Sequence, residues 1–520
     1  MARVTFLAVV WILLSPASLL AASFTVNSTM DAGDADLTDG VCATAGPSPV
    51  CTLRAAIEQA NANQGDDTIT VPANTYTLAN GALDIDDPSA GALTLSGEGA
   101  GTTIIDGGGT GRVFQISSDA VISGVTIRNG HAVGNYGGGL YNSSNGATGS
   151  LTLSNVVITG NTADVGGGGI QNDNGTITLR DVTVSNNTAA GSGGGISNID
   201  KVMLDGVTIS GNVANGGGGG GIFHDGLSLT LINVTVSGNR AHTHGGGITD
   251  NVGATLTNVT ISGNSTDPGG ASGGNFYYVG DETFMDVIVA NSTFGDDCTG
   301  SGTLTSGGHN LDGANTCSFT GPGDLINTDP RLGPLQDNGG PTFTEALLPG
   351  SPAIDAGAGC PPTDQRGFPR VDGNGDGVVA CDIGAFEFGS HGTGTTTTTT
   401  ITGTTTTTTL PSCSPGATFG SIECRLGVLM AIVGTSVPAG GLHDGLEKSL
   451  MKGIRLTGQA EGAPKRRAKR MLGMAAASLG KFKARLHTAK ARRTIGDAVS
   501  SFQQMAGQIQ DDLRTLRGSL

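Results

Sequence analysis

The residues best suited to bind a metal lie in the stretch DGNGDGVVACD, which begins at Asp372. Asp372, Asn374 and Asp376 occupy positions 1, 3 and 5 of a calcium-loop pattern, and a glycine follows at position 6. Position 12 of such a loop is acidic, but here it is Ile383, and Asp382 comes one residue early. Two interpretations stay open: a calcium site with Asp372, Asn374, Asp376 and Asp382 as ligands, or a turn-rich acidic loop.

Candidates for acid–base catalysis are scattered. A polysaccharide lyase needs a basic side chain beside acidic calcium ligands, and a glycoside hydrolase needs carboxylates about 5–10 Å apart. The basic residues in the middle of the chain fall at different phases of the repeat described below: Arg112, Arg128, Arg180, Lys201, Arg240 and Arg331. His224 precedes an aspartate, and His244 follows about one repeat later. We expect both histidines to be exposed turn residues, and we assign no catalytic residue.

The eight cysteines fall into four pairs of sequence neighbours. Their spacing favours closure within each pair, and disulfides are typical of exported proteins. A zinc site is disfavoured because there is no C-x-x-C motif and no flanking set of histidines. The predicted disulfides are Cys42–Cys51, Cys298–Cys317, Cys360–Cys381 and Cys413–Cys424.

Internal repeats place these residues on a regular scaffold. Similar segments recur at 121–142, 151–172, 177–198, 202–224, 229–250 and 254–264, with a further copy at 284–293. Each full segment holds three short strand-like pieces separated by Gly and Asn clusters, and no piece is long enough for a helix. One strand triplet per coil of roughly 25 residues predicts a right-handed parallel β-helix, with coils stacked about 4.8 Å apart.

Stacking predicts the role of each repeat position. Inward aliphatic residues form one column: Ile127, Ile158, Val184, Ile209, Val236 and Ile261. The residue before each of these points outward: Thr126, Val157, Thr183, Thr208, Thr235 and Thr260. A water- or ice-ordering face is a weak alternative for this outward column, because Val157 interrupts it.

Polar and glycine positions recur at the corners. One asparagine stands at the tight turn after each strand, and we expect it to adopt the left-handed conformation and to bond to its copy one coil away: Asn161, Asn187, Asn212, Asn239 and Asn264. Six consecutive glycines, 216–221, extend a GGG element that the neighbouring repeats share. They predict a sharp corner with closely stacked backbones, an edge that offers no side chains for chemistry.

The N-terminal stretch CTLRAAIEQANA (51–62), followed by GDDTITVPANTYTL (65–78), resembles the CSLREA-type segment of exported bacterial β-helix proteins. It predicts a short amphipathic helix that caps the open end of the solenoid, with an Arg54–Glu58 pair on its surface. Its apolar face is expected to contain Leu53, Ala56, Ile57 and Ala60.

The stretch DPRLGPLQDNGGPTFTEALLPGSPAIDAG (329–357), with DQRGFPR (364–370) and CDIGAFEF (381–388), resembles the choice-of-anchor Q domain. In that family setting, the two modules bracket a pectin-lyase-like β-helix. The resemblance implies an exported surface protein, often described as adhesin-like, whose biochemical function is mostly undefined.

The chain begins with an arginine, an apolar run and small residues, a pattern typical of a cleaved signal peptide. Residues 1–412 hold 10 Lys and Arg against 37 Asp and Glu, whereas residues 413–520 hold 17 against 7. The long acidic part should repel nucleic acid, so no nucleic-acid partner is expected. We expect no transmembrane segment in the mature chain.

The threonine-rich segment between the two parts is expected to be an extended spacer. Beyond it, apolar residues recur every three or four positions and predict a small bundle of helices with basic faces. These basic faces could contact an anionic surface or simply be solvated.

The predicted divisions are a signal peptide (1–22), an N-terminal cap (23–65), a β-helix (66–325), an end module (326–390), a linker (391–412) and a basic helical domain (413–520). The expected function is adhesion, binding or scaffolding at the cell surface or outside the cell, toward carbohydrate or other surface polymers. A polysaccharide lyase or glycoside hydrolase of the pectin-lyase-like fold is the alternative, because fold alone does not determine function.

Overall fold

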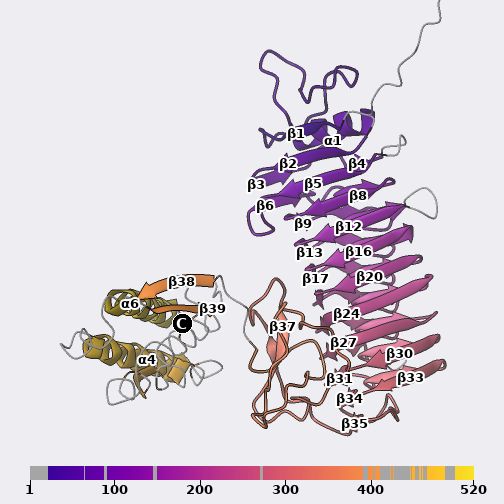
Figure 1. Cartoon of the computed structure of the whole chain (residues 1–520). Helices are drawn as coiled ribbons and strands as arrows, with labels where there is room; N and C mark the ends of the chain where they lie inside the picture. Colours follow the sequence, from indigo (N-terminus) through magenta and orange to yellow (C-terminus); the bar gives the residue numbers. More distant parts are fainter. Residues whose placement is uncertain are drawn as a thin grey trace, which may run out of the picture.

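A computed structural model describes residues 21–390, with gaps at 64, 87–90, 144–148 and 270–272. Beyond residue 390 it describes 396–401, 404–409, 465–486, 498–519 and isolated positions between 422 and 460. Within these residues the chain forms a parallel β-solenoid whose coils follow one another along a single axis (Figure 1). The predicted parallel β-helix is confirmed.

Three parallel sheets form the walls of the solenoid, and the largest of them consists of two columns of strands. The first column of the 20-stranded sheet contains β1 (Ser23–Thr25), β2 (Asp67–Val71), β5 (Leu93–Gly97), β8 (Ala120–Ser123), β12 (Ser150–Ser154), β16 (Thr176–Arg180), β20 (Lys201–Asp205), β24 (Ser228–Ser237), β27 (Ala254–Ser262), β30 (Asp281–Met285) and β33 (Thr303–Gly308). The second column contains β3 (Asn74–Thr77), β6 (Thr103–Asp106), β9 (Thr126–Arg128), β13 (Val157–Thr159), β17 (Thr183–Ser185), β21 (Thr208–Ser210), the far halves of β24 and β27, β31 (Ile288–Ala290), β34 (Leu311–Asp312) and β35 (Leu325–Ile326).

The other two sheets complete each coil. The six-stranded sheet contains β10 (His131–Ala132), β14 (Thr162–Ala163), β18 (Thr188–Ala189), β22 (Val213–Ala214), β25 (Arg240–Ala241) and β28 (Ser265–Thr266). The nine-stranded sheet contains β4 (Leu83–Ile85), β7 (Phe114–Ile116), β11 (Leu140–Ser143), β15 (Ile170–Asn174), β19 (Ile196–Asn198), β23 (Ile222–His224), β26 (Ile248–Asp250), β29 (Phe276–Tyr278) and β32 (Cys298–Gly300).

The interior is built from the predicted aliphatic columns. Strands of successive coils pair without offset, so each inward residue lies against its equivalent one coil away, as Ile158 does against Ile127 and Val184. All six residues of the predicted column are fully buried: Ile127, Ile158, Val184, Ile209, Val236 and Ile261. The period-two alternation of the sequence is therefore the direct cause of the core.

The corner asparagines form a buried hydrogen-bonded ladder, as predicted. The side-chain amide of Asn187, for example, donates to Asn212 Oδ1 at 3.0 Å and to the carbonyl of Ile158 at 3.0 Å. The predicted left-handed conformation was wrong for the ladder asparagines. It falls on the residue before each one, namely Gly160, Asn186, Gly211, Gly238 and Gly263. The ladder asparagines point inward to satisfy buried backbone groups, so the turn is made one residue earlier.

The glycine corner is confirmed as ordered structure. Gly219, within the run of six, has a φ of 67°. A Cβ atom on Gly221 would lie 2.6 Å from the carbonyl oxygen of Gly247 in the next coil. Glycine is required here because the backbones of neighbouring coils approach more closely than any side chain permits.

Helix α1 (Leu53–Ala62) caps the N-terminal end of the solenoid (Figure 1). Thr52 is its N-cap and accepts a hydrogen bond from the Ala55 N–H at 3.1 Å. The predicted apolar face is buried, but the predicted Arg54–Glu58 pair is absent. Arg54 instead forms an ion pair with Asp31 at 2.7 Å, because the preceding loop folds back over the helix.

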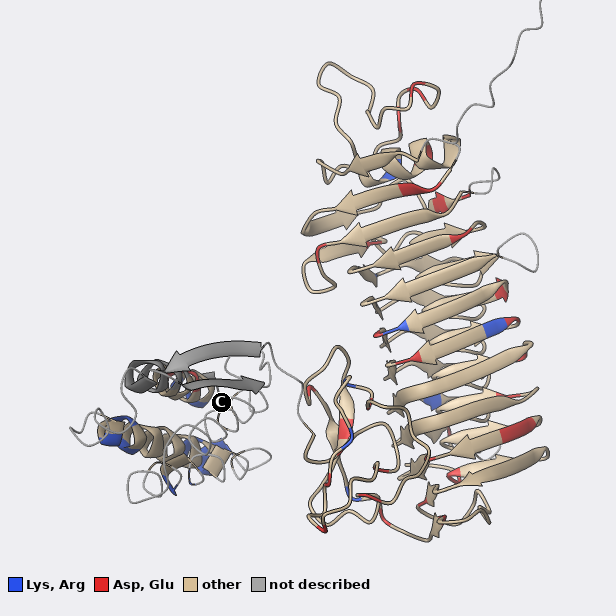
Figure 2. Ribbon diagram, in the orientation of Figure 1, with Lys and Arg blue, Asp and Glu red and all other residues tan. Residues whose placement is uncertain are grey.

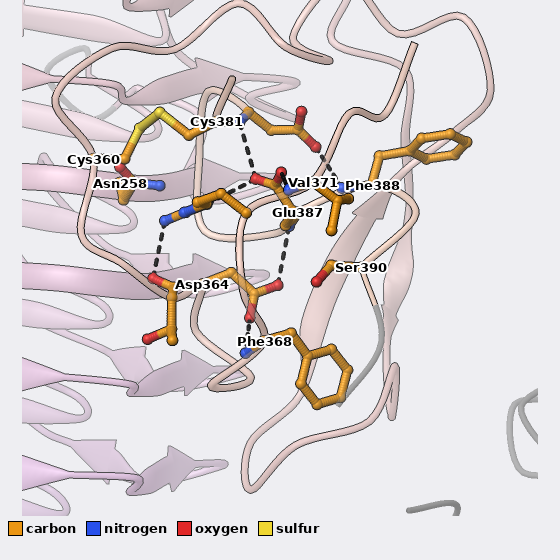
Figure 3. Close-up of polar contacts among 12 residues, drawn as sticks. Asn258, Cys360, Asp364, Phe368, Val371, Cys381, Glu387, Phe388 and Ser390 are labelled. Atoms are coloured by element: carbon orange, nitrogen blue, oxygen red, sulfur yellow. Dashed lines mark hydrogen bonds and ion pairs between the residues drawn. A yellow bond between two sulfur atoms is a disulfide. The ribbon is translucent and has the colours of Figure 1, made fainter. Parts of the chain in front are cut away.

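The end module contains one antiparallel pair, β36 (Leu332–Gln336) and β37 (Thr344–Leu347), and long irregular segments. Glu387 holds these segments together, since its carboxylate pairs with Arg370 at 3.0 Å and accepts the backbone N–H groups of Val371 and Asp382 (Figure 3). The Cys360–Cys381 disulfide closes the same region. The disulfides Cys42–Cys51 and Cys298–Cys317 are also confirmed, whereas Cys413 and Cys424 lie outside the described residues.

The end module packs along the side of the solenoid and covers part of the outward threonine column. Thr208, Thr235 and Thr260 point outward as predicted, yet they are at most 1% exposed. Gln365 donates to the Thr208 hydroxyl at 2.9 Å and accepts from Thr235 at 2.6 Å. This contact leaves no room for an ice-ordering face on these coils.

The C-terminal part is described by itself. The threonine-rich segment, expected to be an extended spacer, forms an antiparallel pair of β38 (Thr396–Ile401) and β39 (Thr404–Thr409). Threonine is β-branched, and this favours strand pairing over an open chain. Helices α4 (Lys465–Leu486) and α6 (Ala498–Ser519) pack through buried side chains that include Leu472, Phe482 and Leu513.

Charge is distributed as the sequence indicates, with acids along the solenoid and bases on α4 (Figure 2). In the part of the chain that the structure describes, no helix is both long and apolar enough to cross a membrane. The predicted signal peptide lies almost entirely outside that part, and β1 starts directly after its predicted end.

Candidate functional site

The outer face of the nine-stranded sheet brings polar and aromatic side chains together. In each strand the first and third residues point inward, so the middle residue faces outward. Strands β7, β11 and β15 pair so that Gln115, Tyr141 and Gln171 lie side by side. Asp173 follows two residues after Gln171 on β15 and points to the same outer face.

Arg112 organises this face. Its guanidinium donates to the Gly137 carbonyl at 2.9 Å, to Gln115 Oε1 and to the Tyr136 carbonyl. It also lies over the Tyr141 ring, 4.6 Å from the ring centroid, which is a cation–π contact. Arg112 therefore joins the glycine corner of one coil to the sheet. We name Arg112, Gln115, Tyr136, Tyr141, Gln171 and Asp173 the Arg112 cluster.

Asp173 is the carboxylate of the cluster. It accepts hydrogen bonds from the Tyr141 hydroxyl and from Gln171 Nε2, the latter at 2.6 Å. Burial, followed by the hydrogen bond to Asp173 and its charge, raises the pKa of Tyr141 to about 12. Tyr141 is thus a proton donor at neutral pH and not a base.

Burial and neighbouring acids act on the pKa of Arg112 in opposite directions. Burial lowers the pKa of Arg112, whereas the nearby Tyr141, Asp84 and Asp173 act to raise it. Asp84 lies one coil before Gln115 in the same outward column, and burial raises its pKa. The cluster offers a cation, a carboxylate, amides and aromatic rings, which can bind a polyhydroxylated ligand through hydrogen bonds and ring contacts.

Sequence reasoning missed this convergence. In the sequence, Arg112 is one of several basic residues at different phases of the repeat. The coil places it beside Tyr141, which in turn binds Asp173. The repeat itself contained the signal, since the outward residue stands two positions after GGG, or after GGN in the case of Tyr277. These outward residues are Tyr141, Gln171, Ser197, Phe223, Thr249 and Tyr277.

The histidine predictions are partly wrong. His224 is not an exposed turn residue, because it is the third residue of β23 and is fully buried inside the solenoid. The ring of His244 lies 4.4 Å from that of Tyr277, centroid to centroid, at a corner of the coil. Burial lowers the pKa of each histidine.

Two further His–Asp pairs lie elsewhere on the outer surface. His131 Nε2 is 2.9 Å from Asp164, and His242 Nδ1 is 3.0 Å from Asp267, which also binds Arg240. Both pairs are largely exposed, as is typical of solvated surface ion pairs.

The predicted calcium ligands are split between two environments. Asp372, Asn374 and Asp376 share an exposed loop, where Asp372 accepts the backbone N–H groups of residues 375–377. Asp382 is fully buried and accepts the N–H groups of Asp355 and Phe388 instead. Burial and the charge of Glu387 raise its pKa to about 7. Asp382 therefore does not complete the loop.

Asp355 lies where Asp382 was expected. Its carboxylate accepts the N–H of Gly373 at 3.1 Å and that of Asn374 at 2.5 Å, so it faces the loop directly. Among the described residues, Asp286, Cys360 and Cys381 also come close enough to resemble a metal site. The two cysteines form a disulfide and offer no thiolate, so this group does not fit a metal.

Comparison with known proteins gives two similarities. A family model of the Chlamydia polymorphic membrane protein repeat matches residues 155–173 and 181–199. Each match runs through a second-column strand and the glycine corner into the nine-stranded sheet. The second match ends beyond β19, and the first includes Gln171 and Asp173.

Among solved structures, the chain is similar to the crystal structure of pectate lyase Pel9A. The two share 15% identity over 71% of this chain and 98% of that chain, with a TM-score of 0.35. No curated protein matches the chain. The CSLREA-type and choice-of-anchor Q resemblances are not among these matches and stay predictions.

Proposed function

We propose that this protein is an exported or cell-surface β-helix protein that binds an extracellular polymer of the carbohydrate class through the Arg112 cluster. The supporting observation is the network in which Tyr141 and Gln171 both donate to Asp173 on one outer face. Amide, phenol and carboxylate groups on one outer face are suited to the hydroxyl groups of a sugar. Similarity to a polymorphic membrane protein repeat agrees with a surface location.

Binding of the full chain to a panel of soluble polysaccharides would test this proposal. Calorimetry should detect at least one ligand. The double substitution Tyr141→Ala and Gln171→Ala should weaken that binding by at least ~10-fold, since it removes the half-buried Tyr141 and the buried amide that holds Asp173 in place. Met203→Ala is the control, because Met203 is a half-buried outward residue on β20, in a different sheet. Equal affinity of the double variant and the control would contradict the proposal.

A polysaccharide lyase or glycoside hydrolase is the second candidate. It is favoured by one observation, the meeting of Arg112, Tyr141 and Asp173 on one face. A hydrolase also needs a second carboxylate, and Asp84 is the candidate, since it neighbours Gln115 in the outward column and its charge acts on Arg112. The same panel should be assayed for new reducing ends and unsaturated products. Product formation that Asp173→Asn abolishes would favour the enzyme.

Calcium binding by the 372–376 loop is proposed with Asp355 in place of Asp382. Calcium titration of the full chain should give heat that is lost in the double variant Asp372→Asn and Asp376→Asn. Absence of heat at millimolar calcium would exclude the site.

Finally, the basic face of α4 is proposed to contact an anionic surface polymer.

A further inference from the structure

A line of polar side chains runs through the interior behind the nine-stranded sheet. The third residues of β11, β15, β19, β23 and β26 point inward and lie in register. They are Asn142, Asn172, Asn198, His224 and Asp250, and all are fully buried. The outer-face cluster does not use this line.

The hydrogen bonds of the line have one direction. The Asn142 amide donates to Asn172 Oδ1 at 2.8 Å, and the Asn172 amide donates to Asn198 Oδ1 at 2.6 Å. Each amide nitrogen also donates to a backbone carbonyl, and this fixes its orientation. The Asn198 amide is thus the donor to His224 Nδ1, at 2.8 Å. The ring proton of a neutral His224 must therefore sit on Nε2.

Two buried carboxyl groups follow His224. Asp250 Oδ1 accepts the N–H of Val252 at 2.8 Å and of Gly253 at 2.7 Å. Glu282, on β30, accepts the N–H of Ala254 at 2.8 Å through Oε2. Three buried atoms are left without a hydrogen-bond partner in this structure: His224 Nε2, Asp250 Oδ2 and Glu282 Oε1.

Glu282 stands in a column that is apolar in the preceding coils back to Leu93, before which Asp67 occupies it. The inward residues of the preceding coils at this position are Ala120, Leu151, Ile177, Val202, Leu229 and Ala254. A buried carboxyl group in such surroundings is costly when ionised, and packing alone would be better served by leucine. Its presence therefore calls for a role beyond filling the core.

We propose that His224, Asp250 and Glu282 form an interior proton-binding site, in which one proton is held between the two carboxyl groups and makes the stability of the solenoid depend on pH. Asp250 has two backbone donors and Glu282 has one, so the proton belongs to Glu282. The Glu282 hydroxyl can donate toward Asp250, and His224 Nε2–H toward the same carboxylate.

The electrostatics agree with this assignment. Burial, together with the charge of Asp250, raises the pKa of Glu282 to about 8. Burial raises the pKa of Asp250 and lowers that of His224. Three other titratable groups interact with His224, Asp250 or Glu282, namely Asp225, Asp281 and Tyr278. The two aspartates disfavour a second negative charge on the Asp250–Glu282 pair.

The sign of the pH dependence follows. Below a pH of about 4.5, the ordinary pKa of a glutamate, the folded and unfolded chains both carry the proton. Between that pH and about 8, the unfolded chain releases the proton while the folded chain keeps it, so stability falls as pH rises. Above about 8, both states are ionised at Glu282 and this loss is complete.

Urea unfolding of the full chain between pH 5 and pH 9 tests the proposal. Glu282→Gln keeps the shape and removes the proton equilibrium. The equilibrium constant for unfolding should rise between pH 5 and pH 9 in the unaltered chain. This rise should be at least ~10-fold larger than the rise measured for Glu282→Gln. Equal pH slopes would overturn the proposal.

Two controls separate the site from general charge effects. Asp329→Asn removes an exposed acid that does not act on His224, Asp250 or Glu282, and it should leave the pH slope unchanged. Glu282→Leu restores the apolar column and should lose the slope as Glu282→Gln does. If neither variant folds, amide hydrogen exchange of residues 276–290 in the unaltered chain provides the test. After correction for intrinsic rates, protection should fall from pH 6 to pH 9, and constant protection would overturn the proposal.

Discussion

Asn212 shows what one buried amide contributes to this solenoid. Its side chain donates to Asn239 Oδ1 at 2.9 Å and to the Val184 carbonyl at 2.9 Å, and it accepts two N–H groups of Asn187. The amide is fully buried, so water cannot replace any of these bonds. An asparagine at this position therefore satisfies two backbone groups of the preceding coil and bonds to the asparagine of the next coil, which no apolar residue can do.

Asn212→Ala should destabilise the chain by about 3 kcal/mol, because it leaves the Val184 carbonyl and the donors of Asn187 unpaired inside the core. Urea unfolding followed by circular dichroism would measure the change. Asn74→Ala is the matched control, since Asn74 is exposed at the start of β3 and should shift the free energy of unfolding only slightly. If the two variants are equally stable, the ladder does not contribute as argued.

At the scale of elements, the contact between the end module and the solenoid is unusually polar. Threonine and serine hydroxyls of β21, β24 and β27 meet Gln365, Glu345 and the Ala385 N–H. Burial raises the pKa of Glu345, although Ser237 binds its carboxylate at 2.6 Å. Such a contact fixes the position of the end module along the solenoid, because a shift would leave these buried hydroxyl groups without hydrogen-bond partners.

Gln365→Ala should loosen the end module selectively. The substitution removes the hydrogen bonds of Gln365 to Thr208 and Thr235 and takes away the acceptor of the Thr235 hydroxyl, whereas Thr208 still donates to the Phe343 carbonyl; the expected cost is about 1–3 kcal/mol. Limited proteolysis and hydrogen exchange should then show faster opening of residues 330–390, with the coils before β20 unchanged. Gln336→Ala, on a half-buried residue of β36, is the control. Global unfolding without selective opening would contradict the argument.

For the whole molecule, sequence reasoning succeeded wherever the pattern was periodic. The Ile127 column, the Asn212 ladder and the glycine corner repeat once per coil, so local pattern determines their place. Contacts across distant segments had no such pattern. Gln365 and Thr208 are 157 residues apart, and nothing in either local stretch indicates the other.

Side chains that replace a repeat residue were the second source of error. His224 stands at the phase of Asn198, so the repeat alone places it inside the solenoid, although its type suggests a surface turn. Glu282 likewise occupies an apolar column. In a solenoid, the register of a residue therefore predicts its burial better than its residue type does. His224 and Glu282, whose types disagree with their positions, each have a buried polar atom without a hydrogen-bond partner in this structure.

The opposite charges of the two ends lead to the last prediction. Lys465, Arg466, Arg467 and Arg470 are exposed on α4, whereas Leu472 and Phe482 of the same helix are buried. Reversing two of these charges, Arg466→Glu with Arg467→Glu, should weaken binding of the full chain to heparin by at least ~10-fold at low salt. The affinity of the unaltered chain should also fall more steeply with salt than that of the variant, because fewer ion pairs remain to be screened. The control reverses two exposed bases of the acidic part, Arg180→Glu with Arg331→Glu, and changes the net charge by the same amount. Equal loss in both double variants would mean that net charge, and not the α4 surface, governs binding.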